Sequence, residues 1–163
     1  MTTHEITLII VLSVLSLISS YGLILYFVFG MIALSAPSRI AFFSSALISF
    51  LVYFAFGMQP HTLLNFIVLP IMVWILQKFR TSVFPEGSST AIVNIRLGIL
   101  GFILTTVFTC INILIVGAIY GTVIGTFVQY LPNNVLTIIL NTALFAVAGN
   151  RLYFYLTRQF LKL

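Results

Sequence analysis

Residues 97–150 read LGILGFILTTVFTCINILIVGAIYGTVIGTFVQYLPNNVLTIILNTALFAVAGN and contain no Asp, Glu, Lys or Arg. One helical crossing of a membrane needs about 20 predominantly apolar residues. The stretch has room for two crossings joined by a turn. Pro132 and Asn133 mark the expected start of the second helix, because a proline at a helix start has no backbone N–H to leave unpaired. This segment predicts a pair of membrane-spanning helices.

The composition extends this interpretation to the whole chain of 163 residues. Hydrophobic residues make up 61% and charged residues 6%, and the mean hydropathy is +1.24. A soluble domain of this length leaves much of its chain at the surface and could not bury so many apolar side chains. Disorder requires low hydrophobicity and high charge, so it is excluded as well. The sequence therefore predicts an integral membrane protein.

Two further uncharged runs, 6–38 and 40–77, precede this stretch. Each has room for two crossings, so the sequence predicts an all-α, polytopic membrane protein, a six-transmembrane-helix bundle. A single membrane domain is expected over 1–163. The expected helices are about 5–20, 24–36, 39–57, 62–79, 91–118 and 132–160. One long tilted helix through the first run is the alternative, because only Tyr21 and Gly22 signal a break there, and it would give five crossings.

The seven basic residues mark one side of the predicted bundle. They fall in or beside four segments: the start of the chain, 36–39, 78–96 and 151–163. The turns expected on the other side contain no basic residue: 21–24, 57–61 and 128–133. Cytoplasmic loops carry an excess of Lys and Arg, so we expect a multi-pass protein with both termini cytoplasmic. Basic residues scattered between apolar runs indicate contact with membrane lipid and argue against a nucleic-acid partner.

The apolar runs lack the groups that most enzymes and ion-coupled transporters use. The two carboxylates, Glu5 and Glu86, lie outside every predicted crossing, whereas ion-coupled transporters usually place an acidic group within the membrane. No nucleotide-binding or hydrolase motif occurs. His4 and His61 are expected on opposite sides of the membrane and cannot share a metal ion, and Cys110 has no partner for a disulfide. The sequence predicts no enzyme activity, no cofactor and no metal.

Polar side chains collect toward the outer half of the predicted bundle. An amide in lipid costs free energy unless it is paired. The cluster is therefore either a set of hydrogen bonds between helices or a water-exposed pocket, and its origin in two turns on one side favours a pocket for a small ligand. The candidate substrate-binding residues are Gln59, His61, Asn65, Asn112, Gln129, Tyr130, Asn133, Asn134 and Asn141.

Two features could hold a negative group of such a ligand. A helix that starts at Pro132 would present free N–H groups and a positive dipole end to the outside, and Asn133 and Asn134 would add amide donors. Arg96 is the remaining candidate, a cation within the expected helix 91–118. It lies about 9 Å from the cytoplasmic end of its helix. It either snorkels to the inner surface or anchors an anion.

Small residues line one face of the first predicted helix. Ser16 and Ser20 are four residues apart, and Ser13 lies near the same face. Such a stripe lets another helix approach closely. Docking of a partner protein and packing within the chain are both open interpretations.

The size, the six expected crossings and the basic C-terminus resemble the substrate-binding S component of an energy-coupling factor (ECF) transporter, a vitamin-uptake system of prokaryotes. The segment Tyr130-Leu-Pro-Asn-Asn-Val-Leu-Thr-Ile-Ile-Leu-Asn141 is similar to the family's Pro-x-Asn entry into an apolar helix that carries an Asn. The resemblance covers nearly the whole chain and is diffuse. It implies high-affinity binding of a vitamin from the outside, in the prokaryotic plasma membrane.

The resemblance also implies partners, namely a coupling transmembrane subunit and two cytoplasmic ATPase subunits. Family members often carry Ala-x-x-x-Ala on the first helix for docking, and the matching stretch here is Ser16-x-x-x-Ser20. Pantothenate is the favoured vitamin, because flat heteroaromatic vitamins usually need stacking rings and the presumed pocket loops contain few. The alternative is a structural or assembly subunit, such as a cell-shape-determining protein, which needs no outer pocket.

Overall fold

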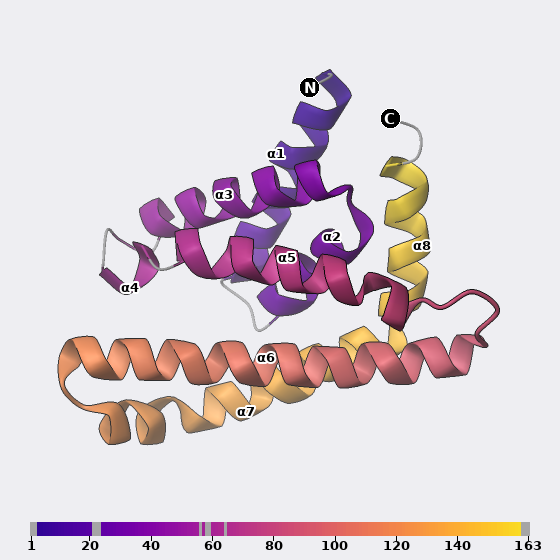
Figure 1. Ribbon diagram of the computed structural model, residues 1–163. Coiled ribbons are helices and arrows are strands. Elements are labelled where there is room, and N and C mark those ends of the chain that lie inside the picture. The colour runs from indigo at the N-terminus through magenta and orange to yellow at the C-terminus, as the bar shows by residue number, and fades with distance from the viewer. Residues whose placement is uncertain (1–2, 21–23, 56, 58–59, 64, 161–163) are drawn as a thin grey trace.

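The computed structural model describes residues 3–20, 24–55, 57, 60–63 and 65–160. Within these residues the chain is all-α and forms eight helices (Figure 1). They are α1 (Thr3–Ser20), α2 (Leu25–Ser35), α3 (Ser38–Ala55), α4 (Pro60–Leu63), α5 (Asn65–Val83), α6 (Thr90–Tyr120), α7 (Val123–Val147) and α8 (Gly149–Phe160). The first uncharged run thus holds two helices rather than one.

Several of these helices are long and apolar enough to cross a membrane. Judged by length and composition, α3, α5 and α6 each qualify within the described residues. The two parts of α7, Val123–Gln129 and Leu131–Val147, qualify as one broken span that is bent by 60°. The described part of the chain is therefore all-α with three or four candidate membrane spans, as expected for a multi-pass membrane protein.

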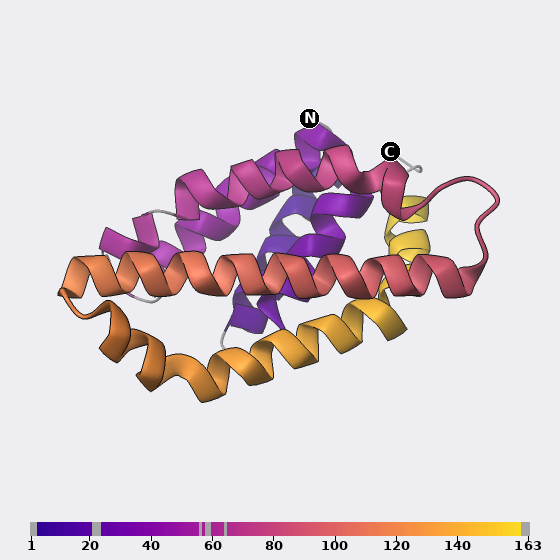
Figure 2. The same ribbon diagram turned by 60° about the horizontal axis from the view of Figure 1, so that its bottom comes forward.

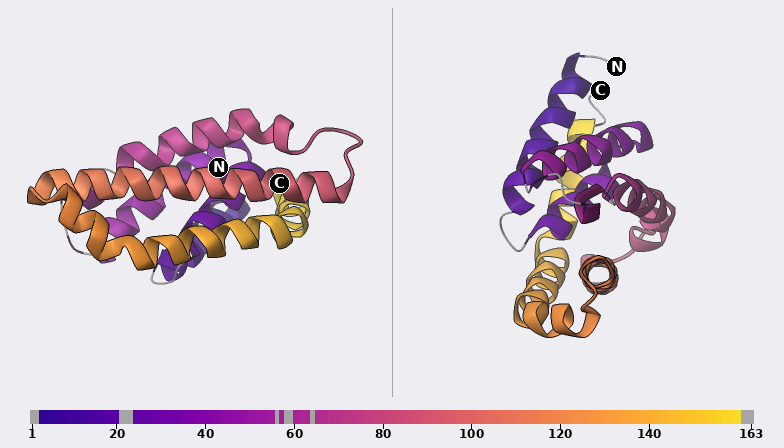
Figure 3. Two further views of the ribbon diagram at one scale, coloured as in Figure 1. Left: turned by 90° about the horizontal axis from the view of Figure 1, so that it is seen from below. Right: turned by 90° about the vertical axis from the view of Figure 1, so that its left-hand side faces the viewer.

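The six-helix bundle predicted from the sequence is not confirmed. In Figure 1, α3, α5, α6 and α7 extend along the long axis of the molecule, whereas α1 and α8 run across it, as Figure 3 also shows. The physical reason is clearest for α2, which has only 11 residues. A helix of that length spans about 16 Å, roughly half of the hydrocarbon core.

The last predicted helix, 132–160, differs most from the structure. Gly121 ends α6 in a left-handed conformation with φ +70°, and α7 already begins at Val123. Pro132 lies inside α7, just after the bend. There the missing N–H and the ring of proline disturb the helix without starting a new one. A second change of direction at Ala148 makes α8 a separate helix.

The short helix α2 is held at both ends by amide side chains from other helices. Residues 29–36 are all buried. No side chain of its own caps its N-terminus; instead the Oδ1 of Asn141 accepts a hydrogen bond from the Phe27 N–H at 2.7 Å. At the other end, the Nε2 of Gln77 donates to the Ala36 carbonyl at 3.0 Å. Helix ends leave backbone groups unpaired, which is costly in an apolar interior, so these two amides allow α2 to be buried.

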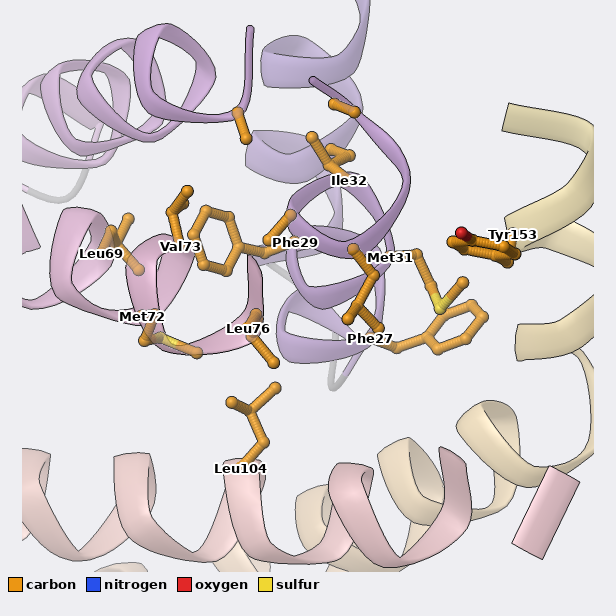
Figure 4. Packing of buried hydrophobic residues seen from close by; sticks show 14 of the residues in the cluster. Phe27, Phe29, Met31, Ile32, Leu69, Met72, Val73, Leu76, Leu104 and Tyr153 are labelled. Atoms are coloured by element: carbon orange, nitrogen blue, oxygen red, sulfur yellow. The ribbon is translucent and has the colours of Figure 1, made fainter. Parts of the chain in front are cut away.

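The hydrophobic core surrounds α2. Figure 4 shows Phe29 of α2 pointing toward Val73 of α5, and Leu76 of α5 pointing toward Leu104 of α6. Except for Leu104, which is slightly exposed, these side chains are at most 1% exposed. The core therefore joins the N-terminal helices to α6.

Phe145 of α7 is fully buried where α7 meets α2 and α6. Its ring contacts Phe27 edge-on, with 5.2 Å between the ring centroids. Two glycines make room for it. A Cβ on Gly30 would stand 2.6 Å from the Phe145 Cζ, and a Cβ on Gly101 would overlap the Phe145 Cδ2. Close packing of this kind depends on the absence of those two side chains.

The described basic residues gather at one end of the molecule. The start of α3, the end of α5, the start of α6 and all of α8 lie toward this end, and α4 and the α6–α7 turn lie toward the other (Figure 1). The Nε of Arg80 donates to the Tyr153 hydroxyl at 3.1 Å, and Phe84 stacks on Tyr153 with ring centroids 3.5 Å apart. These contacts join α8 to the end of α5. We call this the basic end; it contains Arg39, Lys78, Arg80, Arg96, Arg151 and Arg158.

Candidate functional site

A cavity of about 490 Å³ lies toward the end of the molecule opposite the basic end. Pockets for small organic ligands have volumes of about 300–1,000 Å³. The walls come from the second half of α6, the turn after it, both parts of α7 and the start of α2. The lining residues are Tyr26, Thr109, Asn112, Ile113, Val116, Tyr120, Thr122, Thr126, Gln129 and Asn134. We call it the amide cavity.

One face of α6 forms the longest wall of the amide cavity. Thr109, Asn112, Val116 and Tyr120 follow one another at spacings of three or four residues. Residues at these spacings lie on the same side of a helix. The polar members of this series therefore point into one space, and the exposed side chain of Tyr120 lies where that space opens to the surface.

The opposite wall comes from α7 and depends on its bend. Thr122, Thr126 and Gln129 share a face in the turn and in the first part of α7, and Asn134 belongs to the second part. Figure 2 shows α7 bending between these parts as it runs beside α6. Because the bend changes the direction of the helix, residues from both parts reach the same cavity.

Two glycines bring the start of α7 against the end of α6. The positive φ of Gly121 lets the chain reverse, and the Thr122 N–H donates to the Gly117 carbonyl at 2.9 Å. Positive φ favours glycine, which has no Cβ to clash with the backbone. A Cβ on Gly117 would stand 2.5 Å from the Cα of Val123. This close approach places the first turn of α7, which contains Thr126, against the end of α6.

The amide cavity offers hydrogen-bonding groups and no charge. The described residues that line it are all uncharged. The Nδ2 of Asn112 donates to the Tyr26 hydroxyl at 3.2 Å, across the space between α6 and α2. The Nδ2 of Asn134 is buried and has no hydrogen-bond partner within the described residues. An unpaired buried donor costs about 1–3 kcal/mol, so a ligand with a carbonyl, carboxylate or hydroxyl acceptor would be favoured beside it.

The structure brings three predicted site residues together in this cavity: Asn112, Gln129 and Asn134. Asn133 is exposed and does not line it, and its carbonyl accepts a hydrogen bond from the Thr137 hydroxyl at 2.8 Å. Asn65 begins α5 outside the cavity, where its carbonyl accepts from the Ser49 hydroxyl at 2.9 Å.

Some predicted residues fall outside what the structure describes. Gln59 lies outside the described residues, and so do the side chains of His61, Tyr130, Ser16 and Ser20. Their predicted roles therefore stay predictions.

Ser13, the third residue of the small-residue stripe, is fully buried. Helix α1 packs against α2 and α3 of the same chain. The burial of Ser13 favours packing within the chain over docking of a partner at this residue.

The predicted anion sites are not formed as expected. Since α7 begins at Val123, the N–H groups at the start of this helix are not next to Asn133. Arg96 lies near the other end of α6, about 20 Å along the helix from Thr109. Its Nη1 donates to the Ser82 carbonyl at 2.7 Å. The amide cavity and Arg96 are therefore separate features.

Asn141 lies away from the cavity and has a structural role. It is fully buried, and besides accepting from Phe27 it donates through Nδ2 to the Thr137 carbonyl at 2.7 Å. Its amide links α7 to the first turn of α2.

Five hydrogen-bonding residues of the cavity are absent from the predicted substrate-binding set: Tyr26, Thr109, Tyr120, Thr122 and Thr126. The helical spacing of Thr109, Asn112, Val116 and Tyr120 was visible in the sequence. Tyr26 had no such signal, because its position depends on how α2 packs. Within the described part of the chain, His, Cys, Asp and Glu side chains form no group of three that could hold a metal ion.

Comparisons of the chain with protein-family models, with curated proteins and with solved structures found no match.

Proposed function

We propose that this protein binds a small, water-soluble vitamin in the amide cavity and delivers it across the membrane as the S component of an ECF transporter. The observation that supports this most directly is the cavity itself. It is large enough for such a ligand, is lined by hydrogen-bonding side chains and contains an unpaired buried amide donor, that of Asn134.

The position of the amide cavity relative to the membrane supports access from outside. If Arg96 marks the inner boundary of the hydrocarbon core, a core of about 30 Å ends near Val116 on α6. Tyr120 and Gln129, at the exposed side of the cavity, then lie in the outer interface, where tyrosine is common.

The energy for transport would come from partners. The chain contains only two carboxylates, Glu5 and Glu86, one in the first turn of α1 and the other between α5 and α6. The proposal therefore includes the coupling transmembrane subunit and the two ATPase subunits that the family resemblance implies. Copurification of an ATPase pair with the tagged protein from native membranes would support this assembly.

The lining of the cavity contains groups that suit more than one class of vitamin. Pantothenate has the carboxylate, amide and hydroxyl groups that the amides and threonines could bind. However, Tyr26 and Tyr120 both line the cavity, so aromatic rings are present for a flat ligand. Pantothenate is the first compound to test, alongside flat heteroaromatic vitamins.

Ligand binding is expected to raise the melting temperature of the detergent-purified protein. At a concentration of about 100 times Kd, binding stabilises by about 2.7 kcal/mol, which corresponds to a rise of about 5 °C or more for a domain of this size. The measurement is thermal unfolding with a panel of water-soluble vitamins. Asn134→Ala should reduce the rise, whereas the neighbouring and exposed Asn133→Ala should retain it. No rise with any vitamin would favour a structural or assembly subunit.

The proposed topology places both termini in the cytoplasm, and single cysteines can test it. The four candidate spans, α3, α5, α6 and α7, fit this orientation with or without two further crossings by α1 and α2, and a cysteine between α1 and α2 distinguishes the two cases. In a Cys110→Ala background, Ser88→Cys between α5 and α6 should react with a membrane-impermeant thiol reagent only from the cytoplasmic side. Ile124→Cys, at a residue 81% exposed, should react only from outside. Gly22→Cys should also react from outside. Reaction from the cytoplasmic side would show that α1 and α2 do not form two crossings.

A further inference from the structure

A second cavity of about 480 Å³ lies between α5 and α6 and is almost entirely apolar. Its rims are formed by Phe79 on α5 and by Ile99, Ile103 and Val107 on α6. These rim side chains are 49–55% exposed, so the cavity opens sideways as a groove. Since α5 and α6 are both candidate spans, the open side of this groove would face lipid in a membrane.

Arg96 stands in the lining of this groove, near its end at the basic end of the molecule. Its Nη1 donates to the Ser82 carbonyl at 2.7 Å, which holds the guanidinium across from α6 toward the end of α5. That acceptor is a neutral carbonyl, and the guanidinium has further N–H donors in a fork that matches phosphate oxygens. The groove therefore has a positive group at one end and an apolar remainder.

The length of the groove matches one leaflet of a membrane. From Arg96 to Val107 the rise along α6 is about 17 Å. Half of a hydrocarbon core of about 30 Å is about 15 Å. An acyl chain that enters beside Arg96 would reach the middle of the membrane at the far end of the groove.

We propose that the groove between α5 and α6 binds one anionic phospholipid from the leaflet at the basic end. The phosphate contacts Arg96, and an acyl chain lies against Phe79, Ile99 and Ile103. Charge complementarity favours this occupant over a helix of another protein, because the exposed guanidinium of Arg96 can donate to phosphate oxygens and an apolar helix face supplies no anion. The assignment is independent of the vitamin-binding proposal.

Native mass spectrometry can count the lipids retained by the detergent-purified full chain. Phosphatidylglycerol and phosphatidylcholine with identical acyl chains are added in separate titrations. Phosphatidylglycerol should bind about tenfold more tightly, which is the size expected for a charge-assisted hydrogen bond. Glycerol phosphate, which has the headgroup chemistry without acyl chains, should not compete at the same concentration. If glycerol phosphate competes, the site recognises phosphate without an acyl chain and the lipid proposal fails. Equal affinity of the two lipids would also overturn the proposal.

Substitutions test the headgroup contact and the acyl-chain contact of the lipid site one at a time. Arg96→Gln should remove the preference for phosphatidylglycerol, and Arg96→Lys should keep part of it. Arg151→Gln, an exposed basic residue of α8 at the same end, is the matched control and should leave the preference unchanged. Ile103→Trp should fill the groove and weaken both lipids. If Ile103→Trp releases a copurifying polypeptide and leaves lipid binding intact, the groove is a protein-docking face and the proposal fails.

Discussion

Replacing Gly101 with alanine is expected to destabilise the protein by about 2–3 kcal/mol, the cost typical of overpacking a tight core. The added Cβ would overlap the Phe145 Cδ2 and stand 2.7 and 2.8 Å from Cγ and Cβ of the same residue. Because atoms near the root of the side chain are involved, a change of rotamer cannot clear the contact, and α6 and α7 must move apart. Thermal unfolding in detergent measures the loss.

Gly125→Ala is the matched control for Gly101→Ala. Both glycines lie within helices, so both substitutions gain about 1 kcal/mol of helix propensity. A Cβ on Gly125 would meet only the Thr122 side chain, at 3.6 Å, so this variant should be neutral or more stable. Phe145→Ala removes two of the three atoms that the added Cβ would meet, so the double variant Gly101→Ala, Phe145→Ala should lose less stability than the sum of the two single losses. Equal melting temperatures for Gly101→Ala and Gly125→Ala would contradict the packing argument.

The sequence predicted the all-α class and the apolar helices of a multi-pass membrane protein because these depend on local pattern. Uncharged runs of sufficient length predict apolar helices, and basic residues at their ends predict a basic end of the molecule. It could not predict that Phe145 packs on Gly30 and Gly101, because that contact joins three helices that are distant in the sequence. The observed crossing of α1 and α8 over the other helices depends on the same kind of tertiary contact (Figure 3).

The errors at the start and end of α7 have a physical cause. Pro132 is compatible both with a helix start and with a bend in a continuing helix, and the sequence pattern does not distinguish these outcomes. The left-handed Gly121 places the reversal of the chain ahead of Pro132. The predicted anion site at Asn133 was therefore wrong in its backbone geometry, although its neighbour Asn134 does line the amide cavity.

The candidate site could be predicted only where two helices that are consecutive in the sequence, α6 and α7, supply the residues. Asn112, Gln129 and Asn134 follow from polar residues near one predicted turn. Arg96 was a candidate because the sequence shows its charge and not its distance from that turn. Tyr26 was missed because it reaches the cavity from α2, whose placement depends on contacts at both of its ends.

Replacing Asn141 with leucine is expected to cost about 1–3 kcal/mol, because it leaves the buried Phe27 N–H without its acceptor. Leucine is similar in size to asparagine, so loss of the hydrogen bond rather than a cavity should dominate the effect. The Nδ2 donor to the Thr137 carbonyl is lost as well. Thermal unfolding gives the stability change, and hydrogen exchange of the Phe27 amide should become faster than in the parent protein.

Asn141→Leu should also affect ligand binding in the amide cavity, because Asn141 holds the first turn of α2. Tyr26 lines the cavity and precedes Phe27, so the amide of Asn141 fixes the turn from which Tyr26 reaches Asn112. If the cavity binds a vitamin, Asn141→Leu should weaken the ligand-dependent rise in melting temperature, although residue 141 does not line the cavity. Asn133→Leu, an exposed residue of the same helix, serves as the control and should alter neither exchange nor binding. Unchanged exchange at Phe27 in Asn141→Leu would show that α2 does not depend on this cap, because a buried N–H that loses its acceptor no longer has the bond that protects it from solvent.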